Sequence, residues 1–118
     1  MDYIDGFVVP VPRENREAYR ALAAKMAPIF MKHGATRLVE CWGTDVPDGK
    51  VTDFRRAVDA KEGEEIVFSW ISWPDKATRD AGMAKVREDS EMDMGAGMPF
   101  DGQRMIFGGF ETIVDETG

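Results

Sequence analysis

The chain has 118 residues, of which 43% are hydrophobic and 31% charged, and its formal net charge at pH 7 is −7. This length and composition are typical of one globular domain with one core, so we expect a single domain over residues 1–118. The negative charge repels phosphate backbones, and no segment gathers Lys or Arg among aromatic residues, which argues against a nucleic-acid partner.

The N-terminal segment, MDYIDGFVVPVP, alternates enough to predict a strand over residues 3–11, with its two prolines at an edge or exit of the sheet. It carries acidic residues where a signal peptide would carry Lys or Arg, and no run reaches the roughly 20 apolar residues of a membrane helix. Cys41 is the only cysteine, which suits a reducing compartment and predicts a small buried hydrophobe. We therefore expect a cytoplasmic protein without a membrane partner.

Residues 13–34 have apolar side chains at steps of three and four, from Tyr19 to His33, and then Gly34 in the position of a C-terminal cap. This pattern predicts a helix of about five turns. Pro28 lies inside it and should remove one backbone hydrogen bond and introduce a kink.

A second strand is predicted in ATRLVECWG, residues 35–43. Alternation places Leu38, Glu40 and Trp42 on one face and Val39 with Cys41 on the other, so that the Glu40 carboxylate lies between two apolar neighbours. The following residues, TDVPDGKVTD, form a turn-rich connection, and FRRAVDA is at most two helical turns.

The segment EIVFSWISWPDKATRD, residues 65–80, has large apolar side chains on both faces of a predicted strand that ends at Trp73. Pro74 prevents further ladder pairing, and Asp75 is placed to cap a helix through KATRDAGMAKVRED. SEMDMGAGMPFDG then reads as a loop, and QRMIFGGFETIVDE as the last strand, again apolar on both faces.

This order of elements predicts an α+β fold, the ferredoxin-like βαββαβ arrangement with a four-stranded antiparallel sheet. Two helices can cover only one face of four strands, and we expect the other apolar face to have no cover within the chain. The simplest remedy is a homodimer packed sheet to sheet, with a standard interface of about 800 Å² per partner.

Four stretches carry a family resemblance: DGFVVPVP, HGATRLVECWGTDVPDGKVTDF, EIVFSWISWPDKATRD and MPFDGQRMIFGGF. In this order, and over most of the chain, the sequence resembles the YbaA-like family of small bacterial proteins of unknown function. The resemblance implies the dimeric α/β-barrel superfamily. That superfamily includes cofactor-independent monooxygenases, haem-degrading enzymes, chlorite dismutase-like proteins and muconolactone isomerase-like proteins, whose pockets generally lie between sheet and helices.

His33 and Glu40 are the candidate catalytic residues. His33 is the only histidine and lies on the apolar stripe of the first helix, where it could act as acid, base or haem ligand, or serve as a helix-end histidine bonded to a local carbonyl. Glu40 could have its pKa raised by desolvation and act as a base, or it could form a structural ion pair with Arg37 or Arg104.

The candidate ligand-binding residues are Trp42, Asp45, Met94 and Met98. Flexible thioethers beside glycines suit an adaptable lid, so we expect residues 90–101 to roof a site between sheet and helices, although a disordered surface loop would give the same composition. The sequence shows no EF-hand, phosphate-loop or dinucleotide fingerprint, and we expect neither a metal nor a resident cofactor.

Two functions from different classes fit these features. One is a cofactor-independent small-molecule monooxygenase or isomerase, acting on an aromatic or polyketide-like compound from which His33 or Glu40 removes a proton. The other is a non-catalytic small-ligand-binding or assembly module. The sequence does not decide whether the protein is an enzyme.

Overall fold

The structure, a computed structural model, describes residues 1–92 and 97–118. Its strands are β1 (Tyr3–Pro12), β2 (Arg37–Trp42), β3 (Glu64–Trp73) and β4 (Ile106–Glu111), and its helices are α1 (Arg16–Lys32), α2 (Phe54–Ala57) and α3 (Lys76–Glu88). Short 3₁₀ turns lie at Arg13–Asn15, Ser90–Met92 and Gly102–Arg104.

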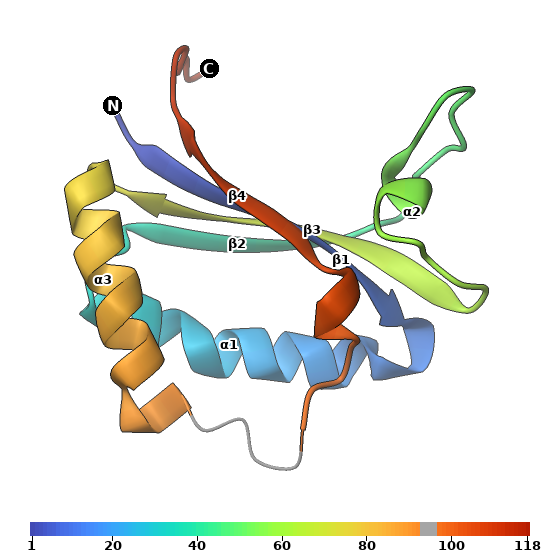
Figure 1. Ribbon diagram of the computed structural model, residues 1–118, viewed down its shortest axis with the longest axis horizontal. Helices are drawn as coiled ribbons and strands as arrows, with labels where there is room; N and C mark the ends of the chain where they lie inside the picture. Colours follow the sequence, from blue (N-terminus) through green and yellow to red (C-terminus); the bar gives the residue numbers. More distant parts are fainter. Residues whose placement is uncertain (93–96) are drawn as a thin grey trace.

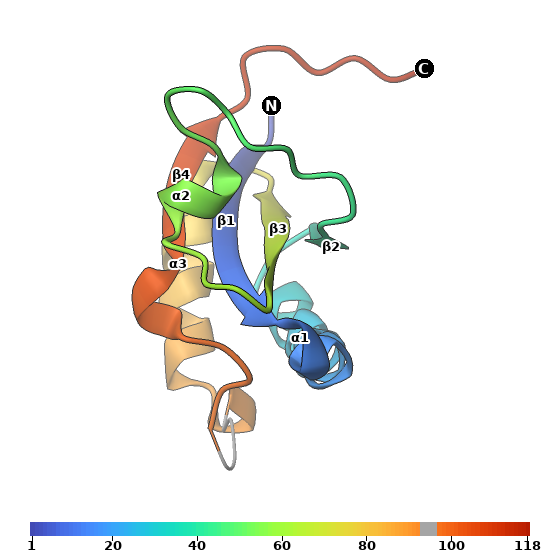
Figure 2. The same ribbon diagram turned by 90° about the vertical axis from the view of Figure 1, so that its right-hand side faces the viewer.

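The strands form one antiparallel sheet in the order β2-β3-β1-β4. The long strands β1 and β3 are its centre, and they pair over their whole length from Tyr3 opposite Trp73 to Pro12 opposite Glu64. Helices α1 and α3 lie on the same side of the sheet, whereas α2 and the C-terminal segment lie on the other (Figures 1 and 2). The predicted α+β order with a four-stranded antiparallel sheet is confirmed, with α2 as the short helix of the connection between β2 and β3.

Local signals set the ends of the helices. The Asp75 side chain accepts a hydrogen bond from the Thr78 backbone N–H at 2.7 Å and so caps α3, directly after Pro74 and the last residue of β3. Helix α1 ends at Lys32, and Gly34 follows with a φ of 111°, a left-handed conformation that glycine adopts without steric cost.

The core between helices and sheet is organised around Trp73, which is 0% exposed. Its indole N–H donates to Asp5 Oδ2 at 2.9 Å, and the Arg79 guanidinium from α3 contacts the same carboxylate, with Nη2 2.8 Å from Oδ1. Phe30 of α1 packs edge-on against Trp73. One buried carboxylate therefore connects β1, β3 and α3.

The face of the sheet opposite α1 and α3 is here called the open face, and the described residues, 1–92 and 97–118, bury it at one end. Val58 and Val46, from the connection between β2 and β3, pack there against Val8 and Ile66. The expectation of no cover at all is therefore wrong in part, because this connection folds back over the sheet. The rest of the open face carries apolar side chains that keep solvent exposure, namely Phe68, Trp70, Ile106 and Phe110.

Cys41 also differs from its prediction. It lies on the edge strand β2, opposite Phe68 in the register with β3, and it is exposed rather than buried. An edge strand on a partly covered face gives its side chain no layer to pack beneath.

Gly82 tests the packing of α3 against the core. It is buried, and a Cβ added there would overlap the Trp73 ring and the His33 carbonyl oxygen. We expect Gly82→Ala to lower the free energy of unfolding by about 1–3 kcal/mol through overpacking, although an alanine in an exposed helix interior gains about 1 kcal/mol over glycine. Urea unfolding measures the change, and an increase in stability would contradict this packing.

Candidate functional site

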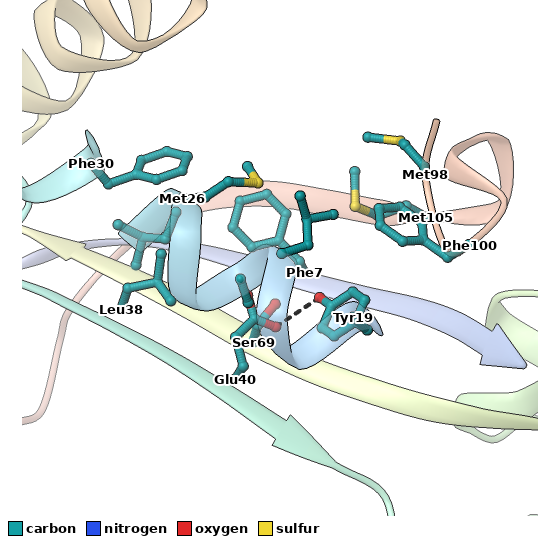
Figure 3. Close-up of a pocket in the computed structure, with 13 residues that line it drawn as sticks. Phe7, Tyr19, Met26, Phe30, Leu38, Glu40, Ser69, Met98, Phe100 and Met105 are labelled. Atoms are coloured by element: carbon teal, nitrogen blue, oxygen red, sulfur yellow. Dashed lines mark hydrogen bonds between the residues drawn. The ribbon is translucent and has the colours of Figure 1, made fainter. Parts of the chain in front are cut away.

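A largely apolar pocket of ≈ 160 Å³ lies between α1 and the helix-facing side of the sheet. Helix α1 contributes one wall, β1, β2 and β3 the opposite wall, and the segment before β4 the rim (Figure 3). The lining side chains are Phe7, Tyr19, Leu22, Ala23, Met26, Phe30, Leu38, Glu40, Ser69, Ile71, Met98, Phe100 and Met105. An apolar cavity of about 150 Å³ accepts a ligand the size of benzene, so this pocket suits a single small ring.

Residues 97–105 close one side of the pocket and are fastened at both ends. The Asn15 side-chain amide donates to the Pro99 carbonyl at 2.9 Å, and the Phe100 ring packs edge-on against Tyr19 with centroids 5.5 Å apart. At the other end, Arg104 forms a two-pronged ion pair with Glu64, both contacts being 2.7 Å. The segment therefore contributes Met98, Phe100 and Met105 to the pocket as part of the folded structure.

Three polar side chains meet where α1 faces β2 and β3. The Tyr19 hydroxyl donates to Glu40 Oε1 at 2.7 Å, and the two side chains point toward one another (Figure 3). Ser69 lies directly opposite Glu40 in the register between β3 and β2, and it is buried. The pocket thus has an apolar body and one polar group centred on a carboxylate.

The surroundings of Glu40 make its carboxylate more basic than usual. Glu40 keeps contact with solvent from its edge strand, yet neighbouring atoms displace enough water to raise its pKa. Hydrogen bonds from Tyr19 and Ser69 to the carboxylate lower the pKa by a smaller amount. The pKa of Tyr19 is also raised, first by burial and then by the negative charge of Glu40, so Tyr19 stays a hydrogen-bond donor at neutral pH.

The structure brings two of the expected site residues to this pocket. Glu40 and Met98 both line it, and Met98 comes from the predicted roof. Trp42 lines an adjacent groove that also includes Tyr19 and Glu40. Met94 lies outside the described residues. The functional roles of these residues stay predictions.

His33 and Asp45 are not brought to the pocket. His33 follows the last residue of α1, and its Nε2 lies 2.7 Å from Asp89 Oδ2, an oxygen that is also 2.7 Å from Lys32 Nζ. These partners, Lys32 first, hold the pKa of Asp89 well below its usual range. Asp45 is exposed in the connection after β2. The alternative ion pair of Glu40 with Arg104 is wrong, because Arg104 pairs with Glu64 and Asp101.

Sequence reasoning did not identify Tyr19 and Ser69 as site residues. A signal existed for each: a tyrosine on an apolar helix stripe needs a partner for its hydroxyl, and Ser69 is a polar residue facing inward in an apolar strand. Alternation along the strand did predict that the Glu40 side chain lies on the same face of the sheet as Leu38 and Trp42.

Residues 1–92 and 97–118 contain neither a cluster of metal-binding side chains nor a membrane-spanning helix. Within these ranges no three His, Cys, Asp or Glu side chains gather closely enough to hold a metal ion. The helices of the same residues include none whose length and apolar character would let it cross a membrane.

The comparison with known families places this chain in a named group. A family model described as "Protein of unknown function (DUF1428)" matches residues 2–102, which include Tyr19, Glu40 and Ser69. The chain belongs to the DUF1428 family. It is also 61% identical over 117 residues to the "Uncharacterized protein YbaA" of Escherichia coli, covering 98% of this chain and 100% of that protein. The predicted YbaA-like family is confirmed.

Two solved structures resemble the fold at 13% sequence identity. A "De novo designed protein Foldit4" matches with a TM-score of 0.46, covering 95% of this chain and 99% of the designed one. The "Structure of Rv0793 from Mycobacterium tuberculosis" matches with a TM-score of 0.43 and covers 100% of both chains.

Removing the Tyr19 hydroxyl tests the geometry of the polar group. In Tyr19→Phe the carboxylate loses a donor that stabilises its charged form while the apolar surroundings remain, so we expect the pKa of Glu40 to rise above its value in the unmodified protein. Carbon-detected NMR titration of the glutamate side chains measures it, and Glu40→Gln assigns the signal. Tyr3→Phe, which alters a tyrosine away from the pocket, is the control. A pKa that is unchanged or lowered in Tyr19→Phe would show that the hydrogen bond does not act on Glu40.

Proposed function

We propose that the pocket is the active site of a cofactor-independent small-molecule enzyme, a monooxygenase or an isomerase, in which Glu40 is the general base. The observation that supports this most directly is the kind of partner that Glu40 has. Its carboxylate is held by a hydroxyl group beside an apolar cavity, with Tyr19 Oη 2.7 Å from Oε1, and burial raises its pKa. A carboxylate in this environment is a better proton acceptor at neutral pH than one in water.

The two buried carboxylates, Asp5 and Glu64, have cationic partners, which Glu40 lacks among the described residues. Asp5 is paired with Arg79, and Glu64 with Arg104. The hydrogen bonds from Arg104 lower the pKa of Glu64 to about 2, which suits a structural ion pair and not a base. Among the described residues Glu40 forms no ion pair, so its charge is free to change during a reaction.

The first step is the same for both reactions. Glu40 takes a proton from an acidic C–H or O–H group of a small aromatic or polyketide-like compound, and the substrate keeps the electron pair as an enolate or phenolate. In an isomerisation the Glu40 carboxylic acid returns the proton to another atom of the substrate. In an oxygenation the anion forms a C–O bond to molecular oxygen, the second substrate, the Glu40 carboxylic acid returns its proton to give a hydroperoxide, and loss of water leaves a carbonyl. The apolar walls limit the access of water to the anion.

The role of Glu40 can be tested by turnover assays. Purified protein is screened by native mass spectrometry against aromatic, quinone and lactone metabolites, and each binder is assayed for product between about pH 5 and 9, a range that brackets the optimum expected for a general base. We expect Glu40→Gln to lower kcat by about 10²- to 10⁴-fold with binding retained, because the amide cannot accept the proton.

The matched control is Glu62→Gln, a change of the same chemistry at an exposed residue away from the pocket, and it should leave kcat unchanged. His33→Ala should also keep turnover, since His33 is bonded to Asp89 and does not line the pocket. Full activity in Glu40→Gln would exclude Glu40 as the base.

A non-catalytic small-ligand-binding or assembly module is the second candidate. It is supported by the same hydrogen bond, since a carboxylate that is already satisfied by Tyr19 can serve as a fixed acceptor for a ligand. Tight binding with no product across the screen would favour this function over the enzyme.

We further propose that the protein forms a homodimer through the open face, in the ferredoxin-like dimeric arrangement that the resemblance implies. Support comes from the continuous apolar groove on this face, whose volume is ≈ 870 Å³ and whose lining includes Phe68, Trp70, Ile106 and Phe110. Phe110 remains 59% exposed in the single chain. Exposed apolar patches of this kind mark interaction sites, and a second copy of the chain would cover this apolar face with an identical apolar face.

A charge on the open face should separate the dimer. We expect sedimentation equilibrium at micromolar concentration to give twice the 13.2 kDa chain mass for the unmodified protein and the single-chain mass for Phe110→Asp, because a buried unpaired carboxylate opposes association. Val51→Asp places the same charge on a side chain that is 92% exposed in the connection after β2, and it should remain dimeric. A single-chain mass for the unmodified protein would refute the dimer.

The proposed setting is the cytoplasm, with a small-molecule ligand and no nucleic-acid partner. The net charge of −7 supports the absence of a nucleic-acid partner, because the chain as a whole repels phosphate backbones.

A further inference from the structure

A second cavity adjoins the apolar pocket and shares two residues with it. This groove of ≈ 320 Å³ is lined by Arg16, Tyr19, Arg20, Glu40, Cys41, Trp42 and Val67. Because Tyr19 and Glu40 line both cavities, a ligand that occupies both must lie against this hydrogen-bonded pair. The pocket is almost entirely apolar, whereas the groove presents two guanidinium groups.

Arg16 is the arginine available to a ligand in this groove. Its guanidinium lies over the Trp42 ring, 5.3 Å from the ring centroid, and in the described part of the chain it forms no ion pair. The neighbouring Glu17 is instead held by Arg20, with Arg20 Nη2 2.6 Å from Glu17 Oε1. This contact holds the Arg16 guanidinium beside the groove, and among the described residues its N–H groups have no carboxylate partner.

We propose that Arg16 binds a carboxylate of the substrate, and that the substrates are therefore small aromatic or apolar carboxylic acids whose ring enters the apolar pocket. This inference rests on the proposed function, because it takes the pocket as the site of the ring. A planar guanidinium recognises a planar carboxylate through two parallel hydrogen bonds. A chain with 22 acidic and 15 basic side chains repels anions as a whole, so capture of an anion requires a local cation such as Arg16.

The arrangement also indicates which part of such an acid faces Glu40. With the carboxylate in the groove and the ring in the pocket, the carbons between them pass Tyr19 and Glu40, which line both cavities. Protons on carbon beside a carboxylate or an aromatic ring are the more acidic ones of such molecules. The two cavities together thus place the Glu40 carboxylate beside the carbons that join the carboxylate of the substrate to its ring, and not beside the carboxylate or the ring.

A carboxylate fits this groove better than a phosphate ester. Arg16 supplies one guanidinium without an ion pair, and Arg20 is engaged by Glu17. One guanidinium balances the single charge of a carboxylate but leaves half of the charge of a phosphate monoester dianion uncompensated beside Glu40.

The test uses 3-phenylpropanoate and its neutral isostere 3-phenylpropanamide, with Kd measured by calorimetry and by NMR shifts of the pocket methyl groups. We expect the acid to bind the unmodified protein at least about 10-fold more tightly than the amide. Arg16→Met keeps the length of the side chain without its charge, and it should abolish this preference by weakening binding of the acid more than binding of the amide. Arg87→Met, on an exposed arginine of α3, is the matched control and should keep the preference.

A second variant separates this inference from the proposed function. Ala23→Phe fills the apolar pocket from α1 and should weaken binding of both probes, with folding checked by the melting temperature. The carboxylate site would be overturned if the acid and the amide bound equally tightly, or if the preference for the acid survived in Arg16→Met. Neither result would exclude the apolar pocket as the site of the ring. If both probes bound Ala23→Phe as tightly as the unmodified protein, the ring would not lie in the pocket, and the proposed function would be overturned as well.

Two further outcomes count against the carboxylate site. Neither probe binding at concentrations up to about 10 mM, a very weak affinity, would refute the substrate class. Arg16-dependent binding of 2-phenylethyl phosphate that is tighter than that of 3-phenylpropanoate would replace the carboxylate with a phosphate.

Discussion

Strand β3 carries large apolar side chains on both of its faces, and the two long helices of this chain cover only one of them. On the covered face, Trp73 is fully buried and Ile71 nearly so, beneath α1 and α3. On the other, the connection between β2 and β3 shields Ile66 but leaves Phe68 partly exposed. The face that α1 and α3 cover (Figure 1) holds the core and the pocket, while the open face keeps apolar side chains exposed in the single chain.

Two ion pairs connect segments that lie far apart in the chain. Arg79 connects α3 to Asp5 on β1, and Arg104 connects the segment over the pocket to Glu64 at the start of β3. Such pairs contribute little net stability relative to apolar replacements, but removing one partner leaves the charge of the other uncompensated. They therefore fix where the segments lie more than they raise total stability, and the shape of the pocket depends on that.

Much of the fold could be predicted from short-range features of the sequence. Pro74 and Asp75 mark the change from strand to helix, and the alternation of ATRLVECWG gives the face on which Glu40 lies. These features act over a few residues, so the sequence displays them directly. The predicted role of His33 rested on a correct observation, its position at the end of an apolar helix stripe, but the ring is bonded to Asp89 on the segment after α3.

The pocket itself depends on contacts that no local pattern contains. Tyr19 and Glu40 are 21 residues apart on a helix and a strand, and the bond from Asn15 to Pro99 joins residues 84 apart. Which hydroxyl meets which carboxylate is decided by the rotation of α1 over the sheet, and this rotation follows from the packing of the whole core. The periodicity of the sequence identifies the apolar stripe of the helix. It does not give the rotation of the helix about its own axis precisely enough to say which residue of the stripe faces Glu40.

Glu40 and Glu64 show how environment, and not residue type, decides what a carboxylate can do. The guanidinium of Arg104 lowers the pKa of Glu64 to about 2, so this carboxylate stays charged and holds the segment over the pocket across the neutral range. Glu40, with hydroxyl partners and apolar neighbours, has its pKa raised. A cationic partner inside the pocket would reverse that shift and make Glu40 a weaker base. The structure instead has Arg16 in the adjoining groove, over Trp42, where it can act on a ligand without forming an ion pair with Glu40.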